Sequence, residues 1–394
     1  DKEWIAVDRT GGARDGHLYI AWTRFYEVTI QFVRSTDRGT TWSAPVPVSD
    51  PGAVVQWPVP IVLANGNVLV AWDAYNVPEI SYDISTNGGV TWGADQTLST
   101  TTSGPQDEIN GGITIFPYPS LALDETAGPR AGWVYCVYAD AAVGGNGMDV
   151  WCRRSTNHGV SWGNRVRIND DAPGLTRDQF HPWVACDEQG VLTATWYDRR
   201  DDAANYLWHI YMQRSTDGGA TWQPNLRITT VASSPGNAVA GGPPTGGEDR
   251  APDAPSILPL EYQRAGLIGE YSGVAVRAGL IHPVWTDTRN GNQDVFATVI
   301  ADPSGIDGQQ PALIGTRLQA APNPFHGQIG LRWQAPLAAP AIEGASHSIG
   351  IFDAAGRLVR SLSSREARSG EPFVIWDGRD EYGRPSPGGA YVAR

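Results

Sequence analysis

The chain has 394 residues, which is enough for one large domain or two ordinary ones. Its 46 glycines, 29 prolines and 16 tryptophans indicate many turns and large apolar anchors, as in all-β proteins. The formal net charge of −13 argues against nucleic acid and anionic membranes as partners, because both require a basic surface. The sequence has no apolar run of about 18 residues, so no insertion into a membrane is predicted.

Short runs of alternating apolar residues, separated by turn residues, predict strands in groups of four. The first group covers residues 4–8, 18–24, 28–34 and 46–49, and the second covers 59–63, 68–72, 80–84 and 96–99. The third covers 120–123, 134–138, 150–154 and 166–169, and the fourth covers 183–186, 192–197, 210–214 and 226–229. A fifth group has strands at 273–276, 280–286 and 294–299. The second strand of each group carries a Trp after a smaller residue, except in the third group, where Cys136 and Val137 take that place.

One eight-residue pattern, S-T-[DN]-x-G-x-[TS]-W, lies between the third and fourth strands of the first four groups, at 35–42, 85–92, 155–162 and 215–222. A motif that returns at this period indicates a repeat architecture. Asp or Asn in such a turn accepts hydrogen bonds from backbone N–H groups just downstream, and Gly supplies a positive φ. We therefore assign a structural role in these turns to Asp37, Asn87, Asn157 and Asp217.

The pattern resembles the Asp-box, or BNR repeat, of the sialidase-like β-propellers. This resemblance implies an all-β fold in which residues 1–303 form a propeller and each group of strands forms one blade. Five blades can be identified, whereas propellers of this family usually have six. Two alternatives stay open: a ring closed by five blades, or a sixth blade in a region outside this chain, which we prefer.

The three cysteines leave two arrangements open. If Asp140 pairs with Met148 at the end of their hairpin, the cysteines of the two strands face each other. Cys136 and Cys152 would then be placed to form a disulfide. The alternative is that both thiols stay reduced and buried, and Cys186 is left over in either case. The sequence has no metal-ligand spacing, and no metal or cofactor is predicted.

From about residue 304 the pattern changes. The runs at 322–325, 349–360, 376–380 and 383–392 resemble the small Ig-like C-terminal modules of secreted bacterial proteins. We therefore predict an Ig-like β-sandwich at 304–394 that serves secretion, surface attachment or self-assembly; a spacer without a ligand is the alternative. The chain begins at Asp1 without Met or a signal peptide, and we expect a processed secreted or cell-surface protein, or a fragment of one.

Topology predicts where a ligand binds. In an up-and-down blade, the loops after the second strands share one face with the connections between blades, opposite the Asp-box turns. Loops on a rigid scaffold are where binding residues gather. Seven residues on this face are candidates for substrate binding: Arg24, Asp198, Arg199, Arg200, Arg250, Asp287 and Arg289. Arginines can grip a carboxylate through bidentate bonds; the alternative is that these Arg and Asp side chains pair with each other and join neighbouring loops.

The sialidase resemblance also implies catalytic parts: arginines on a substrate carboxylate, a Tyr nucleophile assisted by Glu, and an Asp acid/base. It assigns Tyr271 as the nucleophile, Glu270 as a catalytic partner and Asp107 or Glu108 as the proton donor. Two departures weaken this assignment. The Arg-Ile-Pro motif that opens such enzymes is absent, and Glu270 and Tyr271 are neighbours that would point to opposite sides of a strand.

Three functions are compatible with the sequence, and carbohydrate is the expected partner. The first is a secreted or cell-surface propeller that binds glycans as a non-catalytic relative of the glycosidases. The second is an active exo-glycosidase of the sialidase type. The third is a structural or assembly protein that uses the propeller for protein–protein contacts. Unpaired arginines beside a Tyr would favour the second function, and aromatic side chains without a carboxylate pair would favour the first.

Overall fold

The computed structural model describes residues 1–52, 54–74, 77–102, 107–141, 147–172, 176–238, 266–301, 317–321, 328–334, 348–353, 357–363, 373–387 and 391–393. Arg250 and the run at 322–325 lie outside these residues. The chain folds into two compact units, Asp1–Ala278 with Trp285–Gln293, and Gly279–Val284 with Asp294–Arg394. The predicted domain boundary after residue 303 stays a prediction.

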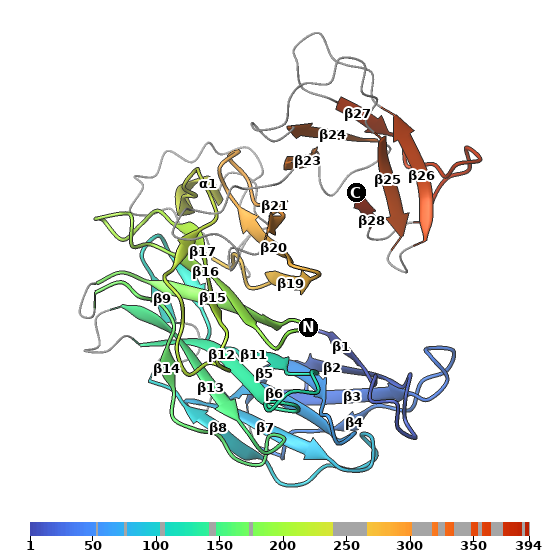
Figure 1. Cartoon of the computed structure of the whole chain (residues 1–394), viewed down its shortest axis with the longest axis vertical. Coiled ribbons are helices and arrows are strands. Elements are labelled where there is room, and N and C mark those ends of the chain that lie inside the picture. The colour runs from blue at the N-terminus through green and yellow to red at the C-terminus, as the bar shows by residue number, and fades with distance from the viewer. Residues whose placement is uncertain are drawn as a thin grey trace. The chain divides into compact units, whose positions relative to one another are not determined.

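Four antiparallel sheets of four strands follow one another along the first unit, each in sequential strand order (Figure 1). The first sheet has β1 (Trp4–Val7), β2 (Leu18–Arg24), β3 (Thr29–Ser35) and β4 (Val46–Pro47). The second has β5 (Val55–Val62), β6 (Val68–Ala74), β7 (Glu79–Ser85) and β8 (Gln96–Thr100). The third has β11 (Ser120–Leu123), β12 (Val134–Ala141), β13 (Met148–Ser155) and β14 (Val166–Arg167). The fourth has β15 (Gln179–Cys186), β16 (Leu192–Asp198), β17 (His209–Ser215) and β18 (Leu226–Arg227).

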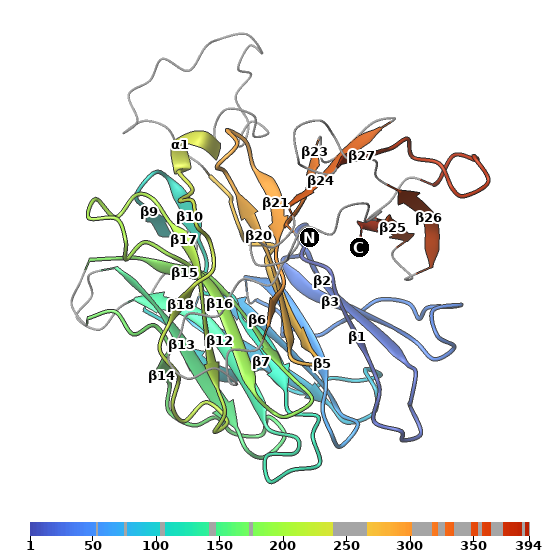
Figure 2. The ribbon, with the colours of Figure 1, turned by 45° about the horizontal axis from the view of Figure 1, so that its top comes forward.

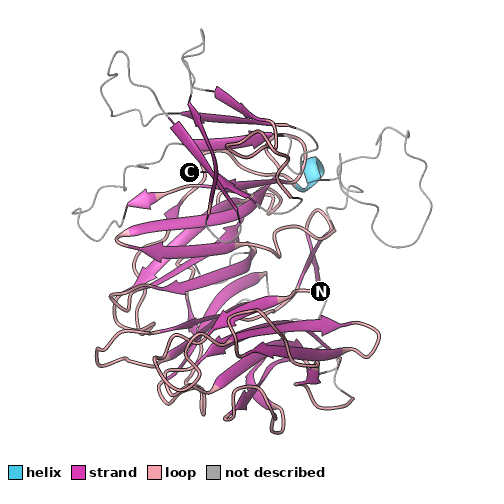
Figure 3. Ribbon diagram, turned by 90° about the vertical axis from the view of Figure 1, so that its right-hand side faces the viewer, coloured by secondary structure: helices cyan, strands magenta, loops and turns pink. Residues whose placement is uncertain are grey.

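The other strands of the first part of the chain form a fifth sheet and a short ribbon. A fifth sheet has the order β19 (Gly273–Arg277), β20 (Leu280–Asp287), β21 (Asp294–Ala297), and β22 (Ile300–Ala301) pairs with β20. A two-stranded ribbon of β9 (Asp107–Ile109) and β10 (Ile113–Ile115) precedes the third sheet. The described residues include one helical turn, α1 (Pro235–Ala238), and are otherwise dominated by strands (Figure 3). Within the part of the chain that the structure describes, no helix is long and apolar enough to cross a membrane.

The first strands of neighbouring sheets pack against one another: β1 against β5, β5 against β11, β11 against β15 and β15 against β19. The sheets therefore radiate from a common axis that their first strands line (Figure 2). This arrangement is that of a β-propeller, in which each sheet is a blade. The all-β propeller predicted from the sequence is confirmed.

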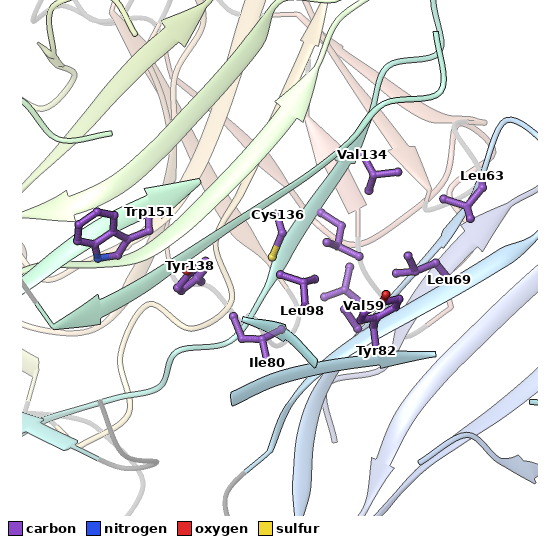
Figure 4. Close-up of a cluster of buried hydrophobic side chains, with 12 residues drawn as sticks. Val59, Leu63, Leu69, Ile80, Tyr82, Leu98, Val134, Cys136, Tyr138 and Trp151 are labelled. Carbon is purple, nitrogen blue, oxygen red and sulfur yellow. The ribbon is translucent and has the colours of Figure 1, made fainter. Parts of the chain in front are cut away.

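Apolar side chains between successive blades form the core. One cluster joins β2 and β3 of the first blade to β6 of the second. The next joins the second blade to the third, where Ile80 and Leu98 face Cys136 and Tyr138 (Figure 4). A third cluster joins the third blade to the fourth. Because each fully buried large side chain stabilises by roughly 1.5–3 kcal/mol, these clusters bind neighbouring blades to one another.

The Asp-box turns are closed by their own side chains. In the first turn, the N–H of Thr41 donates to Asp37 Oδ1 at 2.8 Å, and the Thr41 hydroxyl donates to Asp37 Oδ2 at 2.6 Å. Ser35 Oγ accepts from the N–H of Gly39 at 2.8 Å. The corresponding bonds recur in the other three turns, on Asn87, Asn157 and Asp217. Each later turn brings its Trp onto the preceding blade, as Trp92 does against Phe32 with ring centroids 4.9 Å apart.

The register of the blades corrects one reading of the sequence. The serine that opens each Asp-box pairs with the first residue of the second strand, in the pairs Leu18–Ser35, Val68–Ser85, Val134–Ser155 and Leu192–Ser215. Counted from these pairs, Tyr138 in the third blade takes the place of Trp22, Trp72 and Trp196. The equivalent pair in the third blade is therefore Val137 and Tyr138. The sequence prediction of Cys136 and Val137 was wrong by one residue.

The same register decides the cysteines. Asp140 pairs with Asp149, and not with Met148, so Cys136 lies opposite Arg153. Cys152 lies opposite Val137, one position away. A shift of one residue moves a side chain to the other face of a sheet. All three cysteines are free, so the disulfide alternative was wrong.

The second unit contains two three-stranded sheets in addition to its part of the fifth sheet. One has the order β23 (Arg317–Ala321), β24 (Ile329–Gln334), β27 (Phe373–Trp376), and the other has β26 (Leu358–Ser363), β25 (Ser348–Asp353), β28 (Tyr391–Ala393). Apolar residues of both sheets form one core, which includes Leu331, Ile351 and Trp376. Its assignment as an Ig-like attachment module stays a prediction.

Replacing Gly89 by Ala is expected to destabilise the protein more than replacing Gly219. Both are the fifth residue of an Asp-box, with φ of 77° and 74°, so alanine at either site strains the backbone by about 1 kcal/mol. A Cβ on Gly89 would lie 2.1 Å from Phe32 Cε1, whereas the nearest atom to a Cβ on Gly219 is 3.5 Å away. Overpacking should add about 1–3 kcal/mol at Gly89 alone. Urea unfolding followed by tryptophan fluorescence measures both losses, and equal losses would contradict the packing argument.

Candidate functional site

Four residues occupy one equivalent position in the first strands. Trp4, Val59, Ser120 and Trp183 pair with equivalent residues of their second strands. Two residues before them stand Lys2, Trp57, Tyr118 and His181, which we call the axial group. Lys2, Trp57 and His181 have positive φ values of 53°, 58° and 47°. Residues with side chains rarely adopt this conformation, and such strain is concentrated at functional sites.

The axial group converges on Tyr118. The Lys2 ammonium lies 5.0 Å from the centre of the Tyr118 ring, and the His181 ring stacks on it at 5.5 Å. The Trp57 ring lies 5.9 Å from Tyr118 and 3.8 Å from Phe116. Four blades thus bring their equivalent residues together at the end of the axis that lies opposite the Asp-box turns.

Lys2 is held by aromatic rings and a main-chain carbonyl. Its ammonium donates to the carbonyl oxygen of Glu270 and lies 3.7 Å from the centre of the Tyr271 ring. Only 6% of Lys2 is exposed. Burial lowers the pKa of Lys2 to about 7, although the charges of Glu270 and Glu3 act in the opposite direction. Burial therefore disfavours the charged form of this side chain.

Tyr271 is the exposed member of this site. Its hydroxyl donates to Asp1 Oδ1 at 3.2 Å and accepts from the N–H of Lys2 at 3.3 Å. The other oxygen of Asp1 accepts from Gln56 Nε2 at 2.7 Å. The residue is 52% exposed, and partial burial raises the pKa of its phenol. The ring is thus fixed in place while much of it stays accessible.

His181 is neutral at physiological pH. Burial lowers its pKa to about 3, and the nearby charge of Lys2 acts in the same direction. The carbonyl of Ile268 acts in the opposite direction, with a smaller effect. A histidine with such a pKa is a poor general base near neutrality, so we assign His181 a structural role.

Arg200 and Arg289 hold equivalent places, and each is bound to a carboxylate of its own loop. Arg200 donates to Asp198 through Nε at 3.0 Å and NH2 at 2.8 Å, and it also contacts Asp170. Arg289 donates to Asp287 through Nε at 2.9 Å. The indole N–H groups of the preceding second-strand tryptophans complete the two sites, donating to Asp198 at 2.7 Å and to Asp287 at 2.9 Å. These contacts are the pairing that the sequence left open as an alternative.

The other described candidate arginines are also paired. Arg199 is fully buried and donates to Asp178 at 3.2 Å and to the carbonyls of Asn110 and Asn205. Burial lowers the pKa of Arg199 to about 10. Arg24 forms an exposed ion pair of 3.4 Å with Glu27. Arg250 lies outside the described residues.

The remaining catalytic candidates come from separate elements. Glu270 supplies its main-chain carbonyl to Lys2, and the carboxylate beside Tyr271 belongs to Asp1, not Glu270. Asp107 and Glu108 lie on strand β9, which pairs with β10. The main chain of that ribbon is bonded to Gly266, since the N–H of Thr114 donates to its carbonyl at 3.0 Å. The proton-donor role of Asp107 or Glu108 stays a prediction.

Among the residues that the structure describes, no group of three or more His, Cys, Asp and Glu side chains is arranged to hold a metal ion. Sequence reasoning missed Lys2, Trp57, Tyr118 and Asp1 as site residues. One signal was present: an aromatic residue or His stands before Pro at 57–58, 118–119 and 181–182, each time at the start of a first strand.

A comparison with known protein families supports the Asp-box repeat found in the sequence. The family model of the BNR/Asp-box repeat matches residues 213–224, which contain the whole of the fourth Asp-box, 215–222. The chain is a β-propeller whose blades carry Asp-box turns. No curated protein matches it.

Several solved structures are similar in fold. A protein of unknown function from Dyadobacter fermentans has 14% identity over 85% of this chain and 91% of its own, with a TM-score of 0.47. The leech intramolecular trans-sialidase has 11% identity over 84% of this chain and 64% of its own, with a TM-score of 0.48. This chain thus spans less than two thirds of that enzyme. The GH93 α-L-arabinofuranosidase of Fusarium graminearum has 15% identity over 76% of this chain and 92% of its own, with a TM-score of 0.44. At these TM-scores and identities, none of the three assigns an activity to this chain.

Lys2 is the only lysine in the sequence, so lysine labelled with carbon-13 gives a single ε-carbon signal. We expect its titration midpoint near 7, against an ordinary value of 10.5. Between these values the unfolded state binds more protons, so the free energy of unfolding should rise with pH, by a few kcal/mol at most. Lys2→Met should remove this rise. A midpoint near the ordinary value would show that the ammonium is solvated, contrary to the structure.

Proposed function

We propose that this chain is a carbohydrate-binding β-propeller whose ligand contacts Tyr271 at the axial end. The observation that carries the proposal is the state of this ring. Asp1 and the main chain of Lys2 hold its hydroxyl, the Lys2 ammonium covers its ring, and the residue is still 52% exposed. A ring fixed before binding loses little conformational freedom when a ligand stacks on it. An aromatic face with a polar edge suits a sugar, which presents both C–H and hydroxyl groups.

The arginines support binding over sialidase catalysis. Arg24, Arg199, Arg200 and Arg289 are each engaged by at least one carboxylate of the chain. A substrate carboxylate would have to compete with these partners for the same N–H groups. The proposal therefore takes the protein as a relative of the glycosidases that recognises glycans, and we propose that it does so outside the cell or at its surface.

A glycan array followed by calorimetry tests this function. Tyr271→Ala should weaken binding of the selected glycan by about tenfold or more, as expected for an aromatic anchor. Tyr271→Phe keeps the ring and should retain most of the affinity. Tyr26→Ala is the matched control, because this tyrosine is 93% exposed on the turn between β2 and β3. Equal losses in the Tyr271→Ala and Tyr26→Ala variants, or no glycan bound by the parent, would contradict the proposal.

One observation favours an exo-glycosidase as the second candidate. The Tyr271 hydroxyl donates to the Asp1 carboxylate at 3.2 Å, and a carboxylate beside a phenol is the pairing that a tyrosine nucleophile requires. Fluorogenic sialosides and arabinofuranosides are suitable substrates. Turnover by the parent that is lost in Tyr271→Phe, with glycan binding retained, would make the protein an enzyme of this type. We expect no turnover in either protein.

A further inference from the structure

The environment of Lys2 has the chemistry of a receptor for an ammonium group. Two tyrosine rings, Tyr118 at 5.0 Å and Tyr271 at 3.7 Å, present their faces to one cation, and the carbonyl of Glu270 accepts its N–H. Aromatic faces attract cations through their negative π-clouds, and such cages recognise ammonium ligands. Here the occupant of the cage is a side chain of the protein itself.

The charges around the cage also favour a cation. The carboxylates of Glu270 and Glu3 act on Lys2 in the direction that favours its protonated form. The Asp1 carboxylate is bonded to the Tyr271 hydroxyl at the edge of the same site. His181, whose pKa the charge of Lys2 helps to lower, is neutral near pH 7. The whole chain carries a formal charge of −13, which attracts cationic ligands at long range.

Lys2 is held in the cage against two opposing effects. Its backbone adopts a φ of 53°, which is unfavourable for a residue with a side chain. Its burial lowers its pKa to about 7 and so disfavours the charged form that the tyrosine rings attract. An occupant with these properties is replaceable, whereas a lysine in a carboxylate ion pair at its ordinary pKa would not be.

We propose that the site binds an amino sugar, whose protonated amino group displaces Lys2 from between Tyr118 and Tyr271. This inference rests on the proposed carbohydrate-binding function and names the class of sugar. The sugar ring would lie on the exposed part of Tyr271, and its ammonium would take the place of the Lys2 ammonium at the carbonyl of Glu270. Lys2 is then an internal competitor of the ligand and not a part of its binding site.

Calorimetry with two matched ligands tests this assignment: a glucosamine oligomer with free amino groups and the same oligomer fully N-acetylated. The parent should prefer the free amine by about tenfold, because acetylation removes the charge. Lys2→Met removes the competitor and should tighten binding of the free amine several-fold. Tyr271→Leu should weaken it by about tenfold, Tyr271→Phe should keep it, and Tyr26→Leu should leave it unchanged.

Several outcomes would overturn the inference. Equal binding of the two oligomers would show that the amino group is not recognised. A loss of binding in Lys2→Met, above all for an acidic glycan, would show that Lys2 is a ligand-binding residue. If the protein binds other glycans strongly at Tyr271 but binds neither oligomer, the carbohydrate-binding function stands and the amino-sugar class is rejected. An absence of binding to any glycan would reject both.

A second measurement uses the folded parent alone, so it does not depend on whether a variant folds. The single lysine ε-carbon signal reports the position of Lys2 directly. Addition of the free-amine oligomer should move this signal, and its titration midpoint should rise from about 7 toward the ordinary 10.5, because the displaced side chain becomes solvated. The N-acetylated oligomer should leave it in place. An unchanged signal at saturating free amine would contradict displacement.

Discussion

The pairing between the Asp-box serine and the first residue of the second strand sets the register on which the rest of this propeller depends. It recurs in four blades, from Leu18–Ser35 to Leu192–Ser215. Because side chains alternate between the two faces of a sheet, this one pair decides which residues of a blade face the preceding blade. It places Trp72 in the core between the first and second blades and Tyr138 in the core between the second and third. The Asp-box is therefore a structural element that sets the register of each blade that carries it.

The same register places the axial group. Each first strand is antiparallel to its second strand, so the residues two positions before the paired Trp4, Val59, Ser120 and Trp183 meet at the axis. Lys2, Trp57 and His181 reach this place only with positive φ. The stability of the interblade cores offsets that strain, which costs about 1–3 kcal/mol for each such residue. A rigid scaffold thus holds an unfavourable backbone conformation at the one place where four blades converge.

The electrostatics divide the end of the propeller opposite the Asp-box turns into two parts. In the outer part, Arg200 and Arg289 are neutralised by Asp198 and Asp287, and these contacts join the loops to the tryptophans of the second strands. In the axial part, Lys2 has aromatic rings and a carbonyl as partners. This arrangement differs from the one that the sialidase resemblance implies, in which arginines bind a substrate carboxylate. Here Arg200 and Arg289 bind carboxylates of the protein itself, and the cation at the axis is a lysine with a lowered pKa.

The sequence by itself determined the blades, because the alternation of apolar residues and the turn chemistry of the Asp-box are local and act within about ten residues. It also placed Arg200 and Arg289 in loops that follow second strands, because each comes shortly after a second-strand Trp. Only the tertiary structure decided the partners of these arginines, the faces of Cys136 and Cys152, and the convergence on Tyr118. The main partners of the two arginines lie in their own loops, whereas the faces of the cysteines depend on register and the convergence on Tyr118 depends on contacts between blades. Residues as distant as Lys2 and Tyr271 meet only when the first strands pack around one axis.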